Sequence, residues 1–307
     1  MQVLDHDQVR ARLPMRAAID ALESAIAGGR IARTPPRQHL HEREQELLLM
    51  PSFLDGGATV KLVGIDPANP ARGLPRIQGV VVVFAGPGLT PAAVLDAAAI
   101  TAIRTAAVSG VATRYLARPD SERLVLFGAG PQAHAHLQAM VAVAPVRQVR
   151  VVSRSPGPAA ALVDRARADF GLDAEVAGPE VVADADLVCA CTTSPTPVFD
   201  GARLPPGAHV NAVGSYRPDL QELDAATVRS CRVVVEDREA ALRESGDLVH
   251  AVAAGWEPAA IAADLVELVR DRVPVRGGAE DRTLFDSVGL AYEDLIVAEA
   301  VLRAGGG

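Results

Sequence analysis

The stretch Leu124-Val125-Leu126-Phe127-Gly128-Ala129-Gly130-Pro131-Gln132-Ala133 decides the fold of this 307-residue chain. Its four leading apolar residues predict a buried strand, which ends at a glycine turn and is followed at once by a helical pattern. Gly128 allows the sharp turn, and Gly130 lets the backbone approach a pyrophosphate. The small Ala133 lets helix and strand pack closely. The order of strand, turn and helix therefore predicts a dinucleotide-binding unit.

The start of the predicted helix suits an anion. Pro131 fits the first helical position, because its missing N–H would have no partner there. The free N–H groups of this turn, which includes Gln132, and the positive end of the helix dipole attract a phosphate. A glycine triplet alone is weak support, since ordinary turns also contain such glycines, and the flanking strand and helix make it specific.

Strand and helix patterns alternate in the second half of the chain, which is typical of a parallel sheet with crossover helices. Beyond 124–127, we expect strands at 148–152, 174–176, 187–191, 209–212 and 232–235, with helices at 131–143 and 158–170. A short strand at 283–285 and an amphipathic helix follow. The whole chain is therefore predicted to be an α/β protein, with domain boundaries near residues 115 and 280.

The first half follows another pattern, in which short spacings favour antiparallel neighbours. We expect a capped turn at 5–9, a helix at 15–26 that ends at Gly28-Gly29, strands at 45–50, 59–65 and 77–84, and a helical region at 91–117 that breaks near Ser109-Gly110.

The composition argues against several partners and compartments. A net charge of -8 without a basic run argues against nucleic acid. The longest apolar runs, among them Val80–Ala85, are too short to cross a membrane, and the first residues show no signal pattern. Cys189, Cys191 and Cys231 are too few for a disulfide framework or a zinc site. We expect a cytoplasmic protein.

Arg154 follows the second strand of the alternating half, between Ser153 and Ser155. An acidic residue at this place holds the ribose 2′-hydroxyl of NAD, whereas an arginine accommodates the 2′-phosphate of NADP. Arg154 lies 26 positions after Gly128, beyond the usual spacing of about 20. Arg154 favours NADP(H) over NAD(H), with an exposed arginine beside a turn as the alternative, and we expect Ser153 and Ser155 to bind the cofactor with it.

Three cations in the first half are candidates for a substrate pocket. Lys61 shares one strand face with Val63 and Ile65, where it either points to water from an edge or lies in a pocket. Burial would lower its pKa and let it exchange a proton near neutrality. Arg37 and Arg104 either reach the surface or clamp a carboxylate with two parallel hydrogen bonds.

Histidines offer no complete metal site by spacing. His39 and His41 alternate on one face of a possible strand, without a third ligand spaced to complete the site. His134 and His136 are two apart on a helix and face different ways. We expect a surface or hydrogen-bonded pair at 39 and 41, and no metal.

Several stretches together resemble the ornithine cyclodeaminase/mu-crystallin family, in the family's order and spacing from Arg37 to Asp294. They are 61–63, 67–70, 73–75, 101–107, 128–133, 190–195, 207–222, 244–247 and 284–294. The resemblance implies a discontinuous α+β substrate and dimerisation domain, 1–115 with 281–307, joined to a Rossmann NAD(P)-binding domain, 116–280, in a homodimer.

The resemblance also assigns residues. Members use NAD(P)(H) on small amino or imino acids, and by position their substrate-pocket residues match Arg37, Lys61 and Arg104. Other segments that line the cofactor match Thr192, Thr193, Ser194, Val213, Gly214 and Ser287.

Two departures bear on the reaction. Cyclodeaminases are acidic where this chain has Leu48, and they carry an aspartate after the glycine of 214 where this chain reads Ser215-Tyr216. Neither Leu48 nor Tyr216 can supply a carboxylate to handle an amine. The sequence 214–218 (GSYRP) is more similar to that of the ketimine reductases of the family.

We therefore expect an NADPH-preferring reductase of small cyclic imino acids of the Δ1-pyrroline-2-carboxylate or Δ1-piperideine-2-carboxylate type. Arg37 and Arg104 would hold the carboxylate, with a place near the nicotinamide as the alternative for Arg104. Lys61 would hydrogen-bond the substrate and supply a proton to the imine. The alternatives are ornithine cyclodeaminase, an open-chain amino-acid dehydrogenase such as alanine dehydrogenase, and a non-catalytic NADP(H)-dependent binder of small ligands.

Overall fold

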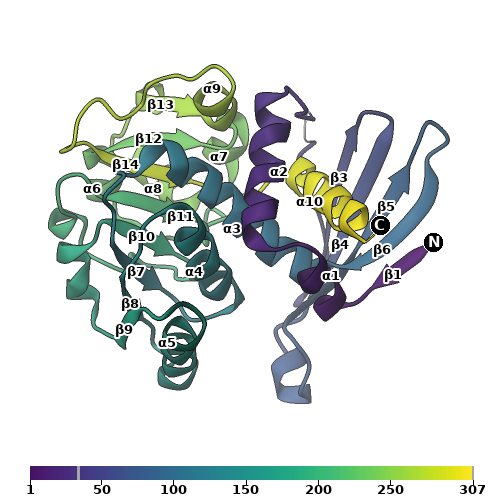
Figure 1. The fold of residues 1–307 in the computed structure, drawn as a ribbon, viewed down its shortest axis with the longest axis horizontal. Coiled ribbons are helices and arrows are strands. Elements are labelled where there is room, and N and C mark those ends of the chain that lie inside the picture. The colour runs from purple at the N-terminus through teal and green to yellow at the C-terminus, as the bar shows by residue number, and fades with distance from the viewer. Residues whose placement is uncertain (33–34, 306–307) are drawn as a thin grey trace. The chain divides into compact units, whose positions relative to one another are not determined.

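A computed structural model describes residues 1–32 and 35–305 of the chain. The chain forms two compact units (Figure 1). Unit 1 consists of Met1–Arg104 with Leu290–Gly307, and unit 2 of Thr105–Gly289. Within the described residues, no helix is both long and apolar enough to cross a membrane.

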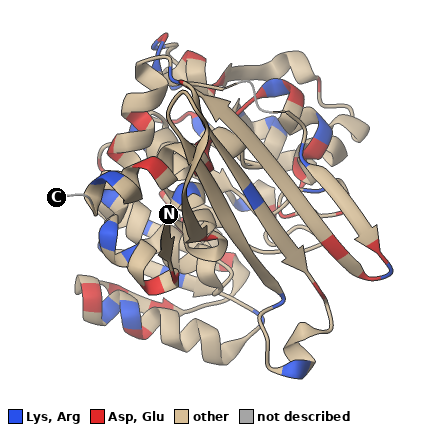
Figure 2. Ribbon diagram, turned by 90° about the vertical axis from the view of Figure 1, so that its right-hand side faces the viewer, with Lys and Arg blue, Asp and Glu red and all other residues tan. Residues whose placement is uncertain are grey.

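Unit 1 is built on a six-stranded sheet in the order β1-β6-β5-β4-β3-β2. Its strands are β1 (Gln2–Leu4), β2 (Gln38–Glu42), β3 (Gln45–Leu54), β4 (Gly57–Ile65), β5 (Ile77–Ala85) and β6 (Thr90–Asp96). Neighbours are antiparallel except β1 and β6, which are parallel. The three strands expected from the sequence, and their antiparallel pairing, are confirmed. Few charged residues lie along the middle of these strands, and more lie toward their ends (Figure 2).

The helices of unit 1 are α1 (His6–Arg12), α2 (Met15–Ala27) and α10 (Ala291–Ala304), with a short 3₁₀ helix, η1 (Asn69–Arg72). A capping box between Asp5 and Gln8 starts α1, and Gly28 and Gly29 end α2 as expected. The yellow helix α10 packs against α2 and against strands β3, β4 and β5 (Figure 1). This helix therefore covers part of one face of the sheet.

The expected helical region 91–117 is partly wrong. Thr90–Asp96 forms β6, which pairs with β5, and the helix α3 begins only at Ala97 and runs to Leu116. Alanine-rich stretches fit either structure, and here the free edge of β5 decides for a strand. The expected break near Ser109-Gly110 is also wrong, since α3 continues through it. Ser109 is held there by bonds to the Thr105 carbonyl and the His136 ring.

Unit 2 is an all-parallel sheet of eight strands in the order β13-β12-β14-β11-β10-β7-β8-β9, which confirms the predicted Rossmann-type α/β fold. Its strands are β7 (Arg123–Phe127), β8 (Gln148–Val152), β9 (Asp173–Val176), β10 (Leu187–Ala190), β11 (His209–Ala212), β12 (Cys231–Val235), β13 (Ile261–Asp264) and β14 (Arg282–Asp286). The chain steps from β7 outward to β9, and then returns to the other side of β7 as β10. This reversal is the switch point where such sheets bind ligands.

Helices connect these strands. They are α4 (Pro131–Val143), α5 (Pro156–Phe170), α6 (Ala225–Ser230), α7 (Arg238–Glu244), α8 (Gly246–Ala253) and α9 (Leu265–Val269), with short 3₁₀ helices η2 (Pro179–Asp184), η3 (Gly201–Arg203) and η4 (Pro258–Ala260). Alternate residues of the central strands, such as Val188 and Ala190 of β10, lie fully buried in the apolar core. Helix α5 begins two residues earlier than expected, at Pro156.

The compact units divide at 104/105 and 289/290, whereas the sequence places the divisions near 115/116 and 280/281. The second difference has a structural cause. Strand β14 pairs with β11 on one side and β12 on the other, so the chain leaves the eight-stranded sheet only after it.

Candidate active site

Four buried charged side chains meet in unit 1. The Lys61 Nζ lies 3.0 Å from Oδ1 and 2.8 Å from Oδ2 of Asp294. The Arg104 guanidinium donates from Nη1 to Oε2 of Glu293 at 2.9 Å, and its Nε lies 3.3 Å from Asp294 Oδ1. None of the four residues is more than 6 % exposed. Asp294 thus joins the lysine and the arginine in one ionic cluster.

The pairing of β3 with β4 and the start of helix α10 place these groups. Lys61 lies opposite Met50 in the β3–β4 ladder, on the sheet face that also carries Leu48 and Val63. Helix α10 covers this face, and Glu293 and Asp294 lie in its first turn. Acidic residues are stabilised there by the positive end of the helix dipole.

Burial gives Lys61 its chemistry. Desolvation lowers its pKa from 10.5 to about 8, against the opposing effect of the Asp294 carboxylate, and the charges of Arg104 and Arg37 lower it further. The amine can therefore donate or accept a proton near neutral pH. The alternative from the sequence, a lysine that points to water from an edge strand, is wrong, since Lys61 is only 3 % exposed.

Arg37 belongs to the same neighbourhood. It directly precedes Gln38, which pairs with Leu49, the neighbour of Met50 along β3. Its charge acts on the Lys61 amine accordingly. The structure thus brings together the three cations singled out in the sequence. Arg104 is buried, so the surface alternative for it is wrong.

The sequence reasoning missed the two carboxylates. Glu293 and Asp294 are both fully buried, although they stand side by side in a mostly apolar terminal helix. Adjacent acids inside such a helix are the signal that could have found them, because buried carboxylates require cationic partners.

In unit 2, the glycine turn after β7 has the backbone that a dinucleotide requires. Gly128 has φ +103°, and a Cβ on it would lie 2.7 Å from the Cys191 carbonyl oxygen, so no other residue fits without strain. Gly130 is the N-cap of α4, Pro131 is its first residue, and a Cβ at Gly130 would meet nothing within 4 Å. The open space at the N-terminus of α4 fits a pyrophosphate.

The other expected cofactor residues follow neighbouring parallel strands. Ser153, Arg154 and Ser155 follow β8, with Arg154 exposed, and the remaining segments follow β10, β11 and β14: Thr192, Thr193 and Ser194; Val213 and Gly214; and Ser287. Gln132 and Ala133 lie in the first turn of α4. Parallel strands end at one edge of the sheet, so these segments share the edge at which α/β sheets bind nucleotides.

One buried carboxyl group, which the sequence reasoning also missed, joins two of these segments. Glu222 accepts from the Thr192 N–H at 2.5 Å and hydroxyl at 2.7 Å, and from the Gly214 N–H at 2.6 Å. Burial and the neighbouring Asp247 raise the pKa of Glu222 to about 8. A Cβ at Gly214 would lie 1.8 Å from the Thr192 carbonyl oxygen, which shows how closely the two turns pack. Glu222 thus fixes the turns after β10 and β11 against each other.

Ser287 is also held by a buried carboxylate. Its hydroxyl donates to Glu236 Oε1 at 2.6 Å, and the other oxygen of Glu236 accepts from the N–H groups of Val288 and Gly289. This glutamate fixes the backbone directly after β14.

The cysteines and two of the histidines lie outside these groups. All three cysteines are free, and burial raises the pKa of Cys189 and of Cys231 to about 12. His39 and His41 lie on β2, where the antiparallel partner β3 brings Glu46 opposite His41. The pairing thus supplies a third potential ligand that spacing along the sequence did not reveal.

The model of the ornithine cyclodeaminase/mu-crystallin family matches residues 1–304, and the chain belongs to this family. Δ1-Pyrroline-2-carboxylate reductase from Bacillus cereus is 36 % identical over 309 aligned positions, which cover 97 % of this chain and 95 % of that protein. The resemblance found in the sequence is confirmed.

Two solved structures are similar throughout. Thermococcus litoralis Δ1-pyrroline-2-carboxylate reductase in complex with NADH and L-proline has a TM-score of 0.93 and 32 % identity, over 99 % of this chain and 97 % of its own. An archaeal alanine dehydrogenase dimer with bound NAD has a TM-score of 0.92 and 30 % identity, over 99 % and 95 %.

Proposed function

We propose that the protein is an NAD(P)H-dependent reductase of small cyclic imino acids of the Δ1-pyrroline-2-carboxylate or Δ1-piperideine-2-carboxylate type. The observation that carries the proposal is the buried Lys61–Asp294–Arg104 cluster of unit 1. Relatives named as Δ1-pyrroline-2-carboxylate reductases, one of them solved with NADH and L-proline, support the substrate class.

The cluster suits an imino acid in three respects. Arg104, with Arg37 near Lys61, provides planar cations for the carboxylate. Leu48, Met50 and Val63 line the same sheet face with apolar side chains against which ring methylenes can pack. Leu48 offers no carboxylate that could hold a second amine, which matches a substrate whose one nitrogen is the imine.

Lys61 is the proton donor of the proposed reaction. Its protonated amine donates to the imine nitrogen, and the resulting positive charge makes the imine carbon more electrophilic. The Asp294 carboxylate lies 2.8 Å from the amine and orients it. Its negative charge raises the pKa of Lys61 and so partly offsets the effect of burial. Helix α10 shields the sheet face and excludes water from it.

The dinucleotide belongs to unit 2. When bound, the reduced nicotinamide supplies the hydride for the imine carbon. The glycine turn after β7 and the start of α4 would hold its pyrophosphate. Arg154, exposed directly after β8, would pair with a 2′-phosphate, and on this ground we assign a preference for NADPH over NADH.

The test is a panel of cyclic imines and open-chain amino acids, followed at the nicotinamide absorbance with both cofactors. Steady oxidation of NADPH by Δ1-pyrroline-2-carboxylate or its six-membered homologue, about 10²–10⁴-fold slower in Lys61→Met, is the expected result. The proposal is contradicted if the protein reduces no imine in the panel. If it also turns over no amino acid but still binds the cofactor, the alternative of a non-catalytic binder is favoured.

An open-chain amino-acid dehydrogenase is the second candidate, favoured by the likeness to the archaeal alanine dehydrogenase. It predicts NAD(P)⁺ reduction with alanine or an N-substituted amino acid, and no imine reduction. The ornithine cyclodeaminase alternative predicts proline from ornithine without net change of the cofactor. Leu48, buried near Lys61, argues against this lyase.

We further propose a homodimer in the cytoplasm. The unit 1 sheet exposes large apolar side chains that a second copy would cover, among them Leu40, Leu47, Phe53, Ile77 and Val80. Free cysteines fit a reducing compartment. Sedimentation analysis that gives the mass of one chain would contradict the dimer.

A further inference from the structure

A second group of potential ligands lies at the hairpin end of the unit 1 sheet. His39 and His41 project from one face of β2, and Glu46 of β3 stands directly opposite His41 in the ladder. The His39 Nδ1 lies 2.5 Å from Glu46 Oε1, and the two imidazole rings are stacked in parallel, 6.1 Å apart with 5° between their planes. The ligand atoms of all three side chains lie within 4.8 Å of one another.

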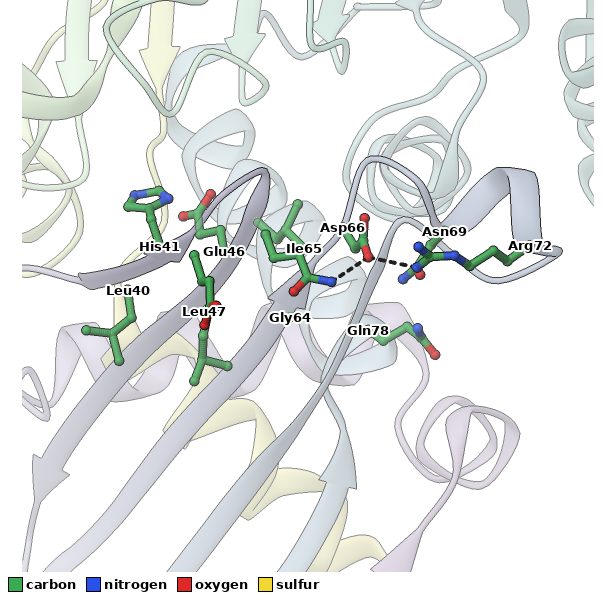
Figure 3. Close-up of a pocket in the computed structure, with 12 residues that line it drawn as sticks. Leu40, His41, Glu46, Leu47, Gly64, Ile65, Asp66, Asn69, Arg72 and Gln78 are labelled. Atoms are coloured by element: carbon green, nitrogen blue, oxygen red, sulfur yellow. Dashed lines mark hydrogen bonds and ion pairs between the residues drawn. The ribbon is translucent and has the colours of Figure 1, made fainter.

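The strand geometry makes this convergence a fixed property of the hairpin. Residues two apart on a strand share a face, and directly paired residues of neighbouring strands also share it. Figure 3 shows the His41 ring and the Glu46 carboxylate side by side, with Leu40 and Leu47 directed to the opposite side. The backbone therefore sets the two imidazoles and the carboxylate beside one another.

We propose that His39, His41 and Glu46 bind one divalent transition-metal ion, with Zn²⁺ as the reference ion. Two imidazole nitrogens and one carboxylate oxygen are ligands that zinc accepts in a tetrahedral site, with water in the fourth position. A zinc ion with bonds of about 2.0–2.2 Å needs its ligand atoms a little over 3 Å apart. Small side-chain rotations provide this spacing, since both histidines are exposed and Glu46 is only partly buried.

The surroundings favour a cation and leave it accessible. The hairpin that joins β2 and β3 carries Glu42, Glu44 and Glu46 against the single cation Arg43. His41 and Glu46 also line a hollow of about 630 Å³, which reaches Asp66 and Gln78 at the ends of β4 and β5 (Figure 3). The fourth ligand position can therefore be filled from solvent.

The site is separate from the ionic cluster of Lys61. It lies on the same sheet face, but His39 is paired with Leu48, whose partner on β4 is Val63, two residues from Lys61. At about 3.3 Å per residue, the His39 row is roughly 7 Å and the His41 row roughly 13 Å along the strand from the Lys61 row. The ion would link the edge strand β2 to β3 and would not touch the proposed proton donor.

The test is equilibrium dialysis of the full-length, tag-free protein against ZnCl₂, with the visible absorbance of bound Co²⁺ as a report on ligand geometry. The wild type is expected to take up one ion per chain, and the double variant His39→Ala/His41→Ala to take up none. Glu46→Gln removes a direct carboxylate ligand and should weaken binding by more than about tenfold, the loss that even an outer-shell partner causes.

The matched control is His6→Ala. His6 forms a histidine–carboxylate pair with Asp96 at 3.1 Å, and the site proposed here differs from that pair by its second imidazole. Binding should be unchanged in this variant. Any of four results overturns the proposal: no saturable uptake by the wild type, equal uptake by the double variant, unchanged affinity in Glu46→Gln, or loss of binding in His6→Ala.

Discussion

In the proposed mechanism, Lys61 sets an alkaline limit on catalysis. The amine must be protonated to donate to the imine, and its pKa in the folded protein is about 8, against 10.5 for an exposed lysine. Activity is therefore full well below pH 8 and falls as the pH rises through this value. At pH 10, two units above the pKa, about 1 % of the amine is protonated, so kcat/KM falls roughly 100-fold from its plateau.

Asp294→Asn tests the cause of this value. The aspartate favours the charged amine from 2.8 Å, so its neutralisation must lower the pKa of Lys61 further. Coulomb's law with the dielectric constant of water, 332/(80 × 2.8), gives a lower bound of about 1.5 kcal/mol, or about one pH unit. The midpoint should move from about 8 to about 7 or below.

The assay is kcat/KM for Δ1-pyrroline-2-carboxylate from pH 5.5 to 10.5, in the wild type, Asp294→Asn and Lys61→Met. The methionine has the length of the lysine without its amine, so the limb should disappear and the plateau should drop by about 10²–10⁴, the usual contribution of a general acid. The same midpoint in Lys61→Met would assign the limb to the substrate or another group and refute the role of Lys61. Thermal melts of the three proteins separate this result from unfolding.

Four further predictions concern unit 2. Gly128→Ala should destabilise the protein by about 1–3 kcal/mol in a denaturant melt, because of its positive φ and a Cβ 2.7 Å from a backbone oxygen. Gly130→Ala should melt like the wild type yet bind NADPH more weakly in a fluorescence titration; unchanged affinity would place the pyrophosphate elsewhere. Arg154→Ala should weaken the binding of NADPH by about 1.5–3 kcal/mol and leave the binding of NADH unchanged. Equal losses of affinity for both cofactors would contradict the assignment of Arg154 to the 2′-phosphate. Asp186 is buried, which raises its pKa, but hydrogen bonds outweigh this effect and hold the pKa below 3.8. Asp186→Asn should therefore cost about 1–3 kcal/mol at pH 7, and its deficit should shrink as the pH falls below 3.8.

Some elements were predictable because their causes are local. The turn at Gly128 follows from backbone sterics and the start of α4 from the chemistry of Pro131, so both lie where the sequence puts them. Strand β6 was mistaken for helix because alanine-rich 90–96 has no decisive period of its own. Its partner β5 decided the structure.

The candidate site divides in the same way. The types and positions of Lys61, Arg37 and Arg104 could be read from the chain, and the family resemblance gave them roles. The carboxylates that hold two of them could not be read: 233 residues separate Lys61 from Asp294, and 189 separate Arg104 from Glu293. The His39–His41–Glu46 group needed the register of one hairpin, although all its members lie within eight residues.

The sequence by itself determined where the chain turns, which faces are apolar, the α/β class and the family, because these depend on neighbours along the chain. Only the tertiary structure decided which charges are buried together and what that burial does to them. A pKa of about 8 for Lys61 is the sum of lost solvation and of charges brought from distant segments. Desolvation and Coulomb energy depend on distances in space, and no spacing along the sequence encodes them.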